Sequence, residues 1–220
     1  MAARRRLARS SALYDPTPDH FSGPVMLDTF LNAWAVEASL QVETLEESWT
    51  SATALTAAVG SGDDSVLANV AKRMELRRVQ EYYSLDHAFY LPRDKLEVLP
   101  ESDNWIRRFQ IVVEHENKFD MKLLQEVSRL LMVDVRLRVL ITYYPDSEKF
   151  FNQILTKIFQ AIQGDDRSQQ FSHDRSFLIL VGSANYDESR LSWLPLLYGT
   201  NSWTPLQEVS VKFRRKKLKL

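Results

Sequence analysis

Two carboxylates near the end of one predicted strand are the first residues in this sequence that could do chemistry. The segment Phe109-Gln-Ile-Val-Val-Glu-His-Glu-Asn-Lys118 is rich in β-branched and aromatic residues, which is typical of a strand. Side chains alternate across a strand, so Glu114 and Glu116 share one face and His115 lies on the other. At ~3.3 Å rise per residue, the two acids lie roughly 6–7 Å apart. Like charges this close repel, which favours a cation bound between them. The alternative is an exposed edge strand whose two acids only solubilise it.

Other ionisable residues nearby extend this candidate site. Asp86 lies in a segment that otherwise suits a half-buried strand, where aspartate is disfavoured. Carboxylate oxygens at sheet ends suit Mg²⁺, which keeps several waters and can activate one for phosphodiester hydrolysis. The candidate catalytic residues are the acids Glu81, Asp86, Glu114 and Glu116, with the cations Lys118 and Lys122.

The elements that must position these residues indicate an α/β fold, in which helices flank a mixed central sheet. Helical spacing covers 26–58, and after a break at 61–64, with Asp64 or Ser65 as N-cap, a helix is expected to run to about residue 83. The predicted strands are 84–90, 105–116, 135–144 and 176–182, and the predicted helices are 119–132 and 149–163. Strands 105–116 and 135–144 should run parallel through a right-handed helical crossover.

The same pattern predicts the domain organisation. Residues 1–22 are expected to form a flexible basic arm, followed by a single α/β domain over 23–220. That domain would contain a helical N-terminal part at 26–83 and a C-terminal aromatic extension with a basic tail at 183–220. The aromatic stretch from Trp193 is expected to pack over the sheet, with an edge strand at 209–213.

The order of elements and acids resembles the PD-(D/E)xK nuclease superfamily, whose core is the restriction-endonuclease-like fold. That family places a glutamate on a first helix, an aspartate on the next strand and an acid-x-lysine motif on the strand after it. The resemblance covers about residues 70–182 and implies Glu81 in the helix position, with Asp86 and Glu114 as the metal-binding acids. It also implies that the backbone carbonyl of His115 completes a Mg²⁺ shell, and that the substrate is nucleic acid, DNA more readily than RNA.

The lysine position of the motif departs from the family, because Glu116 occupies it and Leu85 replaces the proline before Asp86. A glutamate cannot orient the attacking water or neutralise transition-state charge as the lysine does, so Lys118, Lys122 or Arg129 would have to supply the cation. Without such a cation, the chain would be a catalytically degenerate nuclease-fold protein that serves as a binding or assembly module. A hydrolase of sugar phosphates or other small molecules is a third alternative.

Composition excludes several other classes. The chain of 220 residues has no cysteine, which excludes disulfides, thiolate metal sites and a cysteine nucleophile. Its six glycines form neither a Walker A motif nor a dinucleotide fingerprint, and G-x-S-x-G is absent. No apolar run approaches the ~20 residues of a membrane-spanning helix, so we expect a cytoplasmic protein without a membrane partner.

Charge is distributed unevenly along the chain. The segments 1–10 and 211–220 together carry ten basic and no acidic residues, whereas the middle of the chain carries 18 basic and 29 acidic residues. Basic termini can contact phosphates and bring an acidic metal site to a nucleic acid. The candidate nucleic-acid-binding residues are Lys212, Arg214, Arg215, Lys216 and Lys217. A homodimer is also an open expectation.

Overall fold

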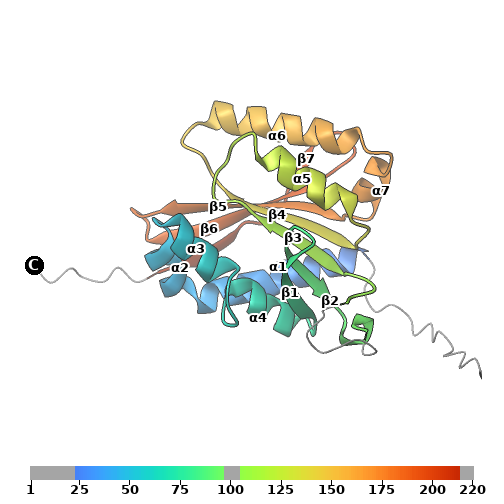
Figure 1. Ribbon diagram of the computed structural model, residues 1–220. Coiled ribbons are helices and arrows are strands. Elements are labelled where there is room, and N and C mark those ends of the chain that lie inside the picture. The colour runs from blue at the N-terminus through green and yellow to red at the C-terminus, as the bar shows by residue number, and fades with distance from the viewer. Residues whose placement is uncertain (1–22, 97–104, 214–220) are drawn as a thin grey trace, which may run out of the picture.

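The N-terminal part of the chain is helical, in agreement with its apolar spacing. The structure is a computed structural model and describes residues 23–96 and 105–213 (Figure 1). It begins with α1 (Gly23–Leu40), α2 (Val42–Ser48), α3 (Ala52–Val59) and α4 (Val66–Arg73). The hydroxyl of Ser65 caps α4 by accepting the N–H of Ala68, which confirms the predicted helix start.

The predicted continuation of that helix to about residue 83 is wrong. Helix α4 ends at Arg73, and Glu75 adopts a left-handed backbone with φ 57°. The chain then forms β1 (Arg77–Tyr82), which pairs antiparallel with β2 (Leu85–Tyr90). The left-handed residue after a helix is most often glycine, so Glu75 gives no recognisable stop signal in the sequence.

The remaining elements build a mixed sheet. They are η1 (Pro92–Asp94), β3 (Ile111–His115), α5 (Leu123–Met132), β4 (Leu137–Tyr143), α6 (Glu148–Gln163), α7 (Ser168–His173), β5 (Phe177–Asn185), β6 (Arg190–Tyr198), β7 (Trp203–Pro205) and β8 (Val209–Lys212). Within the described residues, eight strands form one sheet in the order β1-β2-β3-β4-β5-β6-β7, and β8 pairs with β6. The pairs β3–β4 and β4–β5 are parallel, which confirms the predicted parallel pairing of the two strands joined by α5.

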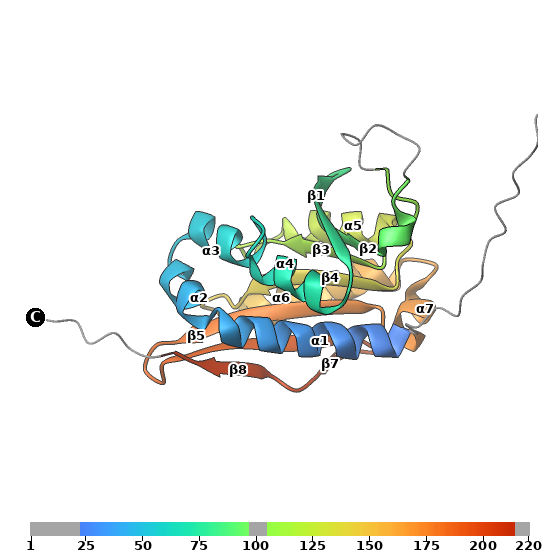
Figure 2. The ribbon, with the colours of Figure 1, turned by 90° about the horizontal axis from the view of Figure 1, so that it is seen from below.

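Helices cover both faces of this sheet. Helices α5, α6 and α7 lie on one face and α1 to α4 on the other (Figure 1), and α1 runs lengthwise beneath the sheet (Figure 2). The core on the α1 side includes an edge-to-face contact between Trp34 and Trp193, whose ring centroids are 5.7 Å apart. The α/β class with a mixed sheet flanked by helices is therefore confirmed. None of the helices in residues 23–96 and 105–213 is long and apolar enough to cross a membrane.

The C-terminal aromatic segment belongs to the sheet and does not pack over it, so that prediction is wrong. Strand β6 pairs with β5 from Arg190 opposite Asn185 to Leu197 opposite Leu178, and the side chain of Trp193 is fully buried. Pro195 within β6 made the segment resemble a loop, because proline cannot donate a ladder hydrogen bond. Its carbonyl still accepts the N–H of Leu206 at 2.9 Å.

Candidate acidic site

Three carboxyl groups from three different elements converge on the α5 face of the sheet. Glu114 is near the end of β3, and its carboxyl group lies within hydrogen-bonding reach of Asp86 on β2 and Glu126 on α5. The Asp86 carboxylate also accepts the backbone N–H of His115 at 2.9 Å, which fixes it against the end of β3. Asp86 and Glu114, which were paired on the basis of sequence, are therefore neighbours in space.

Burial dominates the electrostatics of this cluster. The Glu114 side chain is fully buried, and no N–H or O–H group of the described residues donates to either of its oxygens. Burial, followed by the charges of Asp86 and Glu126, raises the pKa of Glu114 to about 9. Burial also raises the pKa of Glu126. At neutral pH, Glu114 therefore carries a proton, which it can donate to a neighbouring carboxylate.

A guanidinium on α5 supplies the positive charge at this cluster. Arg129 forms an ion pair with Glu126, one helical turn earlier, and its Nη1 lies 3.8 Å from Oε2 of Glu114. The Arg129 side chain is 40% exposed, so it extends from the buried acids to solvent. Arg129 was one of three cations considered from the sequence, and the structure brings it to the acids.

The other predicted acids lie at the margin of the cluster. Glu81 is exposed and lies on β1, so the expectation that it occupies a helix is wrong. Its neighbours Gln80 and Tyr82 pair with His87 and Leu85, which places Glu81 across from Asp86. Glu116 lies just beyond β3 and accepts the backbone N–H of Lys118 at 2.9 Å. Its charge contributes to the raised pKa of Glu126, so it lies near the cluster without joining it.

The two candidate catalytic lysines do not reach the acids. Lys118 and Lys122 are exposed, and within the described part of the chain neither ammonium forms an ion pair with Asp86, Glu114 or Glu126. Lys122 is the N-cap residue of α5, and its N–H donates to the carboxylate of Asp120 at 2.7 Å. Lys212 is exposed at the end of β8, whereas Arg214, Arg215, Lys216 and Lys217 lie outside the described residues, as does the predicted arm at 1–22.

The side chain of His115 lies on the opposite face of the sheet, as strand alternation requires. Its Nε2 is 2.8 Å from the hydroxyl of Tyr143, and burial lowers its pKa to about 4. The Tyr143 ring in turn contacts Trp49 edge-to-face at 5.3 Å. Burial likewise lowers the pKa of His87 to about 3. Both histidines are neutral core residues, and the role expected for the backbone carbonyl of His115 stays a prediction.

The carboxylate oxygens are the type of ligand that a hard cation prefers, although these groups do not form a complete ligand cage. In residues 23–96 and 105–213, no three His, Asp or Glu side chains are arranged to hold a metal ion. Asp86 and Glu114 would supply oxygen ligands, and the Glu114 oxygens lack a protein donor, so they would be available to a cation once the proton leaves. Mg²⁺ held by two such carboxylates would take its remaining ligands from water.

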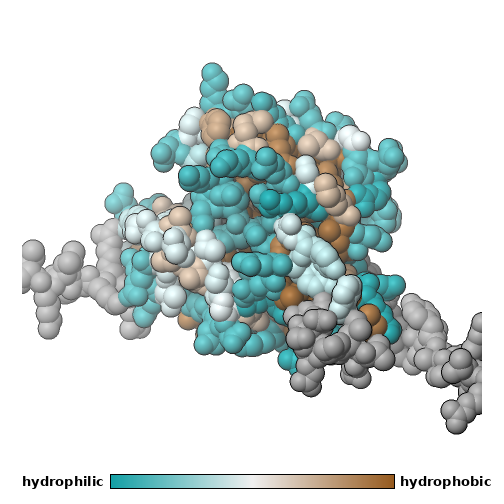
Figure 3. All heavy atoms as spheres, in the orientation of Figure 1, coloured by the Kyte–Doolittle hydropathy of each residue, from teal (hydrophilic) through white to brown (hydrophobic). Residues whose placement is uncertain are grey.

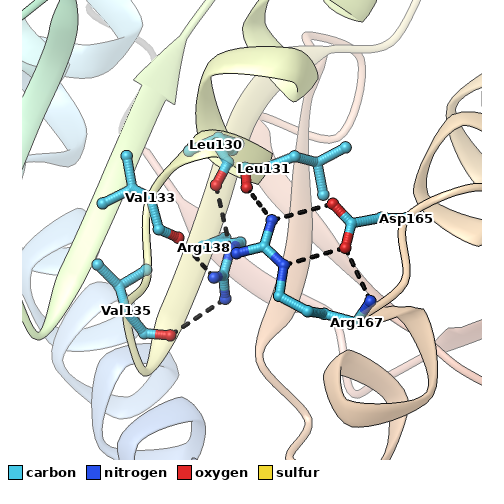
Figure 4. A network of polar contacts seen from close by, with 7 residues as sticks. All are labelled: Leu130, Leu131, Val133, Val135, Arg138, Asp165 and Arg167. Carbon is cyan, nitrogen blue, oxygen red and sulfur yellow. Dashed lines mark hydrogen bonds and ion pairs between the residues drawn. The ribbon is translucent and has the colours of Figure 1, made fainter.

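Two guanidinium groups, one on the buried Arg138 and one on the partly exposed Arg167, anchor the far end of α5, which carries Glu126 and Arg129. Arg138 on β4 donates to the carbonyls of Leu130, Val135 and Val133 at 3.1, 3.1 and 2.6 Å (Figure 4). Arg167 donates to the carbonyl of Leu131 and pairs with Asp165 (Figure 4). Burial lowers the pKa of Arg138 to about 10, which still leaves it charged at neutral pH. These contacts satisfy carbonyls at the end of α5 and so hold the helix in place.

Two polar residues of the site escaped the sequence reasoning. Glu126 lies on the amphipathic helix predicted over 119–132, where a single acid usually faces solvent, so its sequence position did not suggest a buried site. Thr142 on β4 is fully buried with no hydrogen-bond partner for its hydroxyl among the described residues. It lies two residues after Leu140, which packs in the α5-side core, so it shares the face of the acids. Its signal was a hydroxyl side chain within the mostly apolar segment 137–143.

Comparison with known proteins identifies no relative of this chain. No family model, no curated protein and no solved structure matches it.

Proposed function

We propose that this protein is a divergent Mg²⁺-dependent nuclease that hydrolyses phosphodiester bonds in nucleic acid, DNA more readily than RNA. The observation that carries the proposal is the meeting of Asp86 and Glu114 beside Arg129, with both Glu114 oxygens lacking a protein donor. The site lies near the carboxyl end of β3, which runs parallel to β4, and such strand ends are where open α/β sheets bind ligands. The restriction-endonuclease-like resemblance points to the same residues.

Each residue has a defined task in this proposal. Asp86 and Glu114 would hold Mg²⁺, which supplies an activated water and stabilises charge on the phosphate. Glu114 must first lose its proton, so metal affinity should rise with pH. Arg129 takes the task of the missing lysine, because its guanidinium reaches solvent and can neutralise charge on a phosphate oxygen. Glu126 pairs with Arg129 and orients it.

The test is cleavage of plasmid and of single-stranded DNA with Mg²⁺ or Mn²⁺, in wild type and in Asp86→Asn and Glu114→Gln. We expect both substitutions to abolish cleavage, while Glu188→Gln keeps it, since Glu188 is an exposed acid in the β5–β6 turn. Arg129→Met should reduce cleavage strongly, and Arg129→Lys should restore part of it. Full cleavage in both Asp86→Asn and Glu114→Gln would refute the assignment.

One observation favours the second candidate, a degenerate nuclease-fold protein that acts as a binding or assembly module. The proton on Glu114 and the ion pair of Arg129 with Glu126 balance most of the charge in the cluster without a metal. That protein would show no cleavage with either metal in the wild type, but a defined oligomer by light scattering or a defined partner by pull-down. Cleavage that needs Asp86 excludes this candidate.

A further inference from the structure

The turn between β1 and β2 has an unusual backbone for its residues. Tyr83 and Ser84 form a two-residue hairpin loop and have φ angles of 49° and 67°. Such a loop, with positive φ at both positions, is usually occupied by Asn-Gly or Asp-Gly, and a bulky residue rarely adopts this region. The Tyr83 side chain is 74% exposed, so burial in the protein core does not explain the tyrosine at this position.

Aromatic rings meet at this hairpin. The Tyr82 ring lies 4.7 Å from Tyr83 and 5.2 Å from Phe109, edge-to-face in both cases. The Tyr82 hydroxyl accepts the backbone N–H of Ile106 at 3.4 Å, which holds the segment around Ile106 against the hairpin. Trp105 in that segment is 45% exposed. Two exposed aromatic side chains, Tyr83 and Trp105, therefore belong to the two segments that meet at Tyr82.

Two arginines accompany these rings. The strand predicted over 105–116 begins only at Ile111, so Arg107 and Arg108 lie in the irregular segment before it, between Ile106 and Phe109, which both contact Tyr82. Both are exposed, and neither pairs with an acid of the described residues. Aromatic rings interleaved with cations are the arrangement that binds single-stranded nucleic acid, because bases stack on the rings and phosphates pair with the cations.

This surface adjoins the candidate acidic site. Tyr83 precedes Asp86 by three residues, so their Cα atoms are at most about 11 Å apart. Leu85 and Phe109 both pack in the core on the α5 side, the side on which Glu126 and Glu114 meet. A strand bound at the hairpin would therefore lie beside the carboxyl cluster.

We propose that Tyr82, Tyr83, Trp105, Arg107 and Arg108 form a binding surface for single-stranded nucleic acid, called here the aromatic hairpin surface. Bases stack on Tyr83 and Trp105, and Arg107 and Arg108 contact the phosphates. A duplex binds less well, because its base faces are already stacked on one another. This inference deepens the proposed nuclease function, on which it rests for the fate of the strand, by naming its substrate as single-stranded.

The test measures binding of a fluorescent oligothymidine strand, and of its duplex with oligoadenosine, by anisotropy in buffer with EDTA. The decisive variant is Tyr83→Asn, because asparagine suits a positive φ but offers no ring. We expect its Kd for the strand to rise about tenfold, the effect of losing one stacked base, with Tm at or above that of the wild type. Tyr83→Trp should keep the wild-type Kd. The matched control is Ser84→Gly, which eases the same turn but keeps the ring, and it should also keep the wild-type Kd.

Three results would overturn the inference: equal Kd values in Tyr83→Asn and wild type, duplex bound as tightly as the strand, or an equal loss of binding in Ser84→Gly. The outcome is separable from that of the proposed function. Strand binding that depends on Tyr83 in a protein without metal-dependent cleavage removes the nuclease and leaves the surface. Cleavage that needs Asp86, together with binding that does not depend on Tyr83, removes the aromatic hairpin surface and leaves the nuclease.

Discussion

Replacing Glu114 by glutamine should stabilise the protein increasingly as the pH rises. Glu114 is fully buried, and its pKa is raised from about 4.5 in the unfolded chain to about 9 in the folded protein. Between pH 4.5 and about pH 9, the folded state therefore holds a proton that the unfolded state has lost. Stability contributed by this proton is fully present below pH 4.5 and is lost as the pH rises towards 9.

The size of the effect follows from this difference. Each pH unit between the two pKa values removes about 1.4 kcal/mol from the free energy of unfolding. From pH 5 to pH 8 the wild type should therefore lose up to about 4 kcal/mol through this residue. This figure is an upper limit, because Asp86 and Glu126 respond to the same proton. Glutamine has the same size, carries no charge, and can donate an N–H to either neighbouring carboxylate.

Urea denaturation followed by tryptophan fluorescence at pH 5, 6, 7 and 8 measures this difference. The free energies of unfolding of Glu114→Gln and wild type should be closest at pH 5 and should diverge towards pH 8, with the variant more stable. Subtracting one curve of unfolding free energy against pH from the other removes the contributions of other titrating groups. The curve of the control variant Glu188→Gln should be parallel to that of the wild type. A difference between Glu114→Gln and wild type that is independent of pH would refute the view that Glu114 is protonated in the folded protein.

Three further predictions concern the rest of the fold. Arg138→Met removes three hydrogen bonds to carbonyls in the last turn of α5 and in the segment just after it, and should cost about 2–4 kcal/mol of unfolding free energy in urea melts. A cost below about 0.5 kcal/mol would contradict the anchoring role. Glu75→Gly suits the left-handed backbone after α4 and should raise Tm by about 2–4 °C in thermal melts, whereas a lower Tm would contradict the strain argument. The imidazoles of His87 and His115 should be neutral at pH 6 by NMR. The stability that depends on their neutral form should be fully present above about pH 6.5 and should be lost as the pH falls towards about 4 for His115 and about 3 for His87. A protonated ring of either residue at pH 6 would contradict their burial.

The strongly patterned elements were predictable from the sequence because their burial follows one period. Helix α5 has its apolar residues on one stripe, and β4 is apolar apart from Arg138 and Thr142, as expected for a strand covered on both faces. The same alternation in β3 predicted Glu114 and the His115 side chain on opposite faces of the sheet, and the structure agrees, with Glu114 on the α5 face. Asp86 was conspicuous because an acid is unusual in such a strand.

Other features depended on tertiary contacts that no local pattern reports. The end of α4 is formed by a left-handed glutamate, so Glu81 was placed on a helix although it lies on β1. Strand β6 contains a proline and was taken for an extension, although it pairs along its length with β5. Trp193, which begins the predicted aromatic stretch, is buried, whereas the rings of Tyr83 and Trp105 are exposed. Exposure of an aromatic ring is decided by its neighbours in space and cannot be inferred from composition.

His115 touches both layers of the protein and thereby links regions that are distant in the sequence. Its backbone N–H holds the Asp86 carboxylate on the α5 side, and its ring meets Tyr143 and, through it, Trp49 of the N-terminal helical region. A shift in the packing around Trp49 would therefore move the group that orients Asp86. The N-terminal helices are thus part of the scaffold of the acidic cluster. We expect substitutions on that remote face to change the orientation of the Asp86 carboxylate without contacting it.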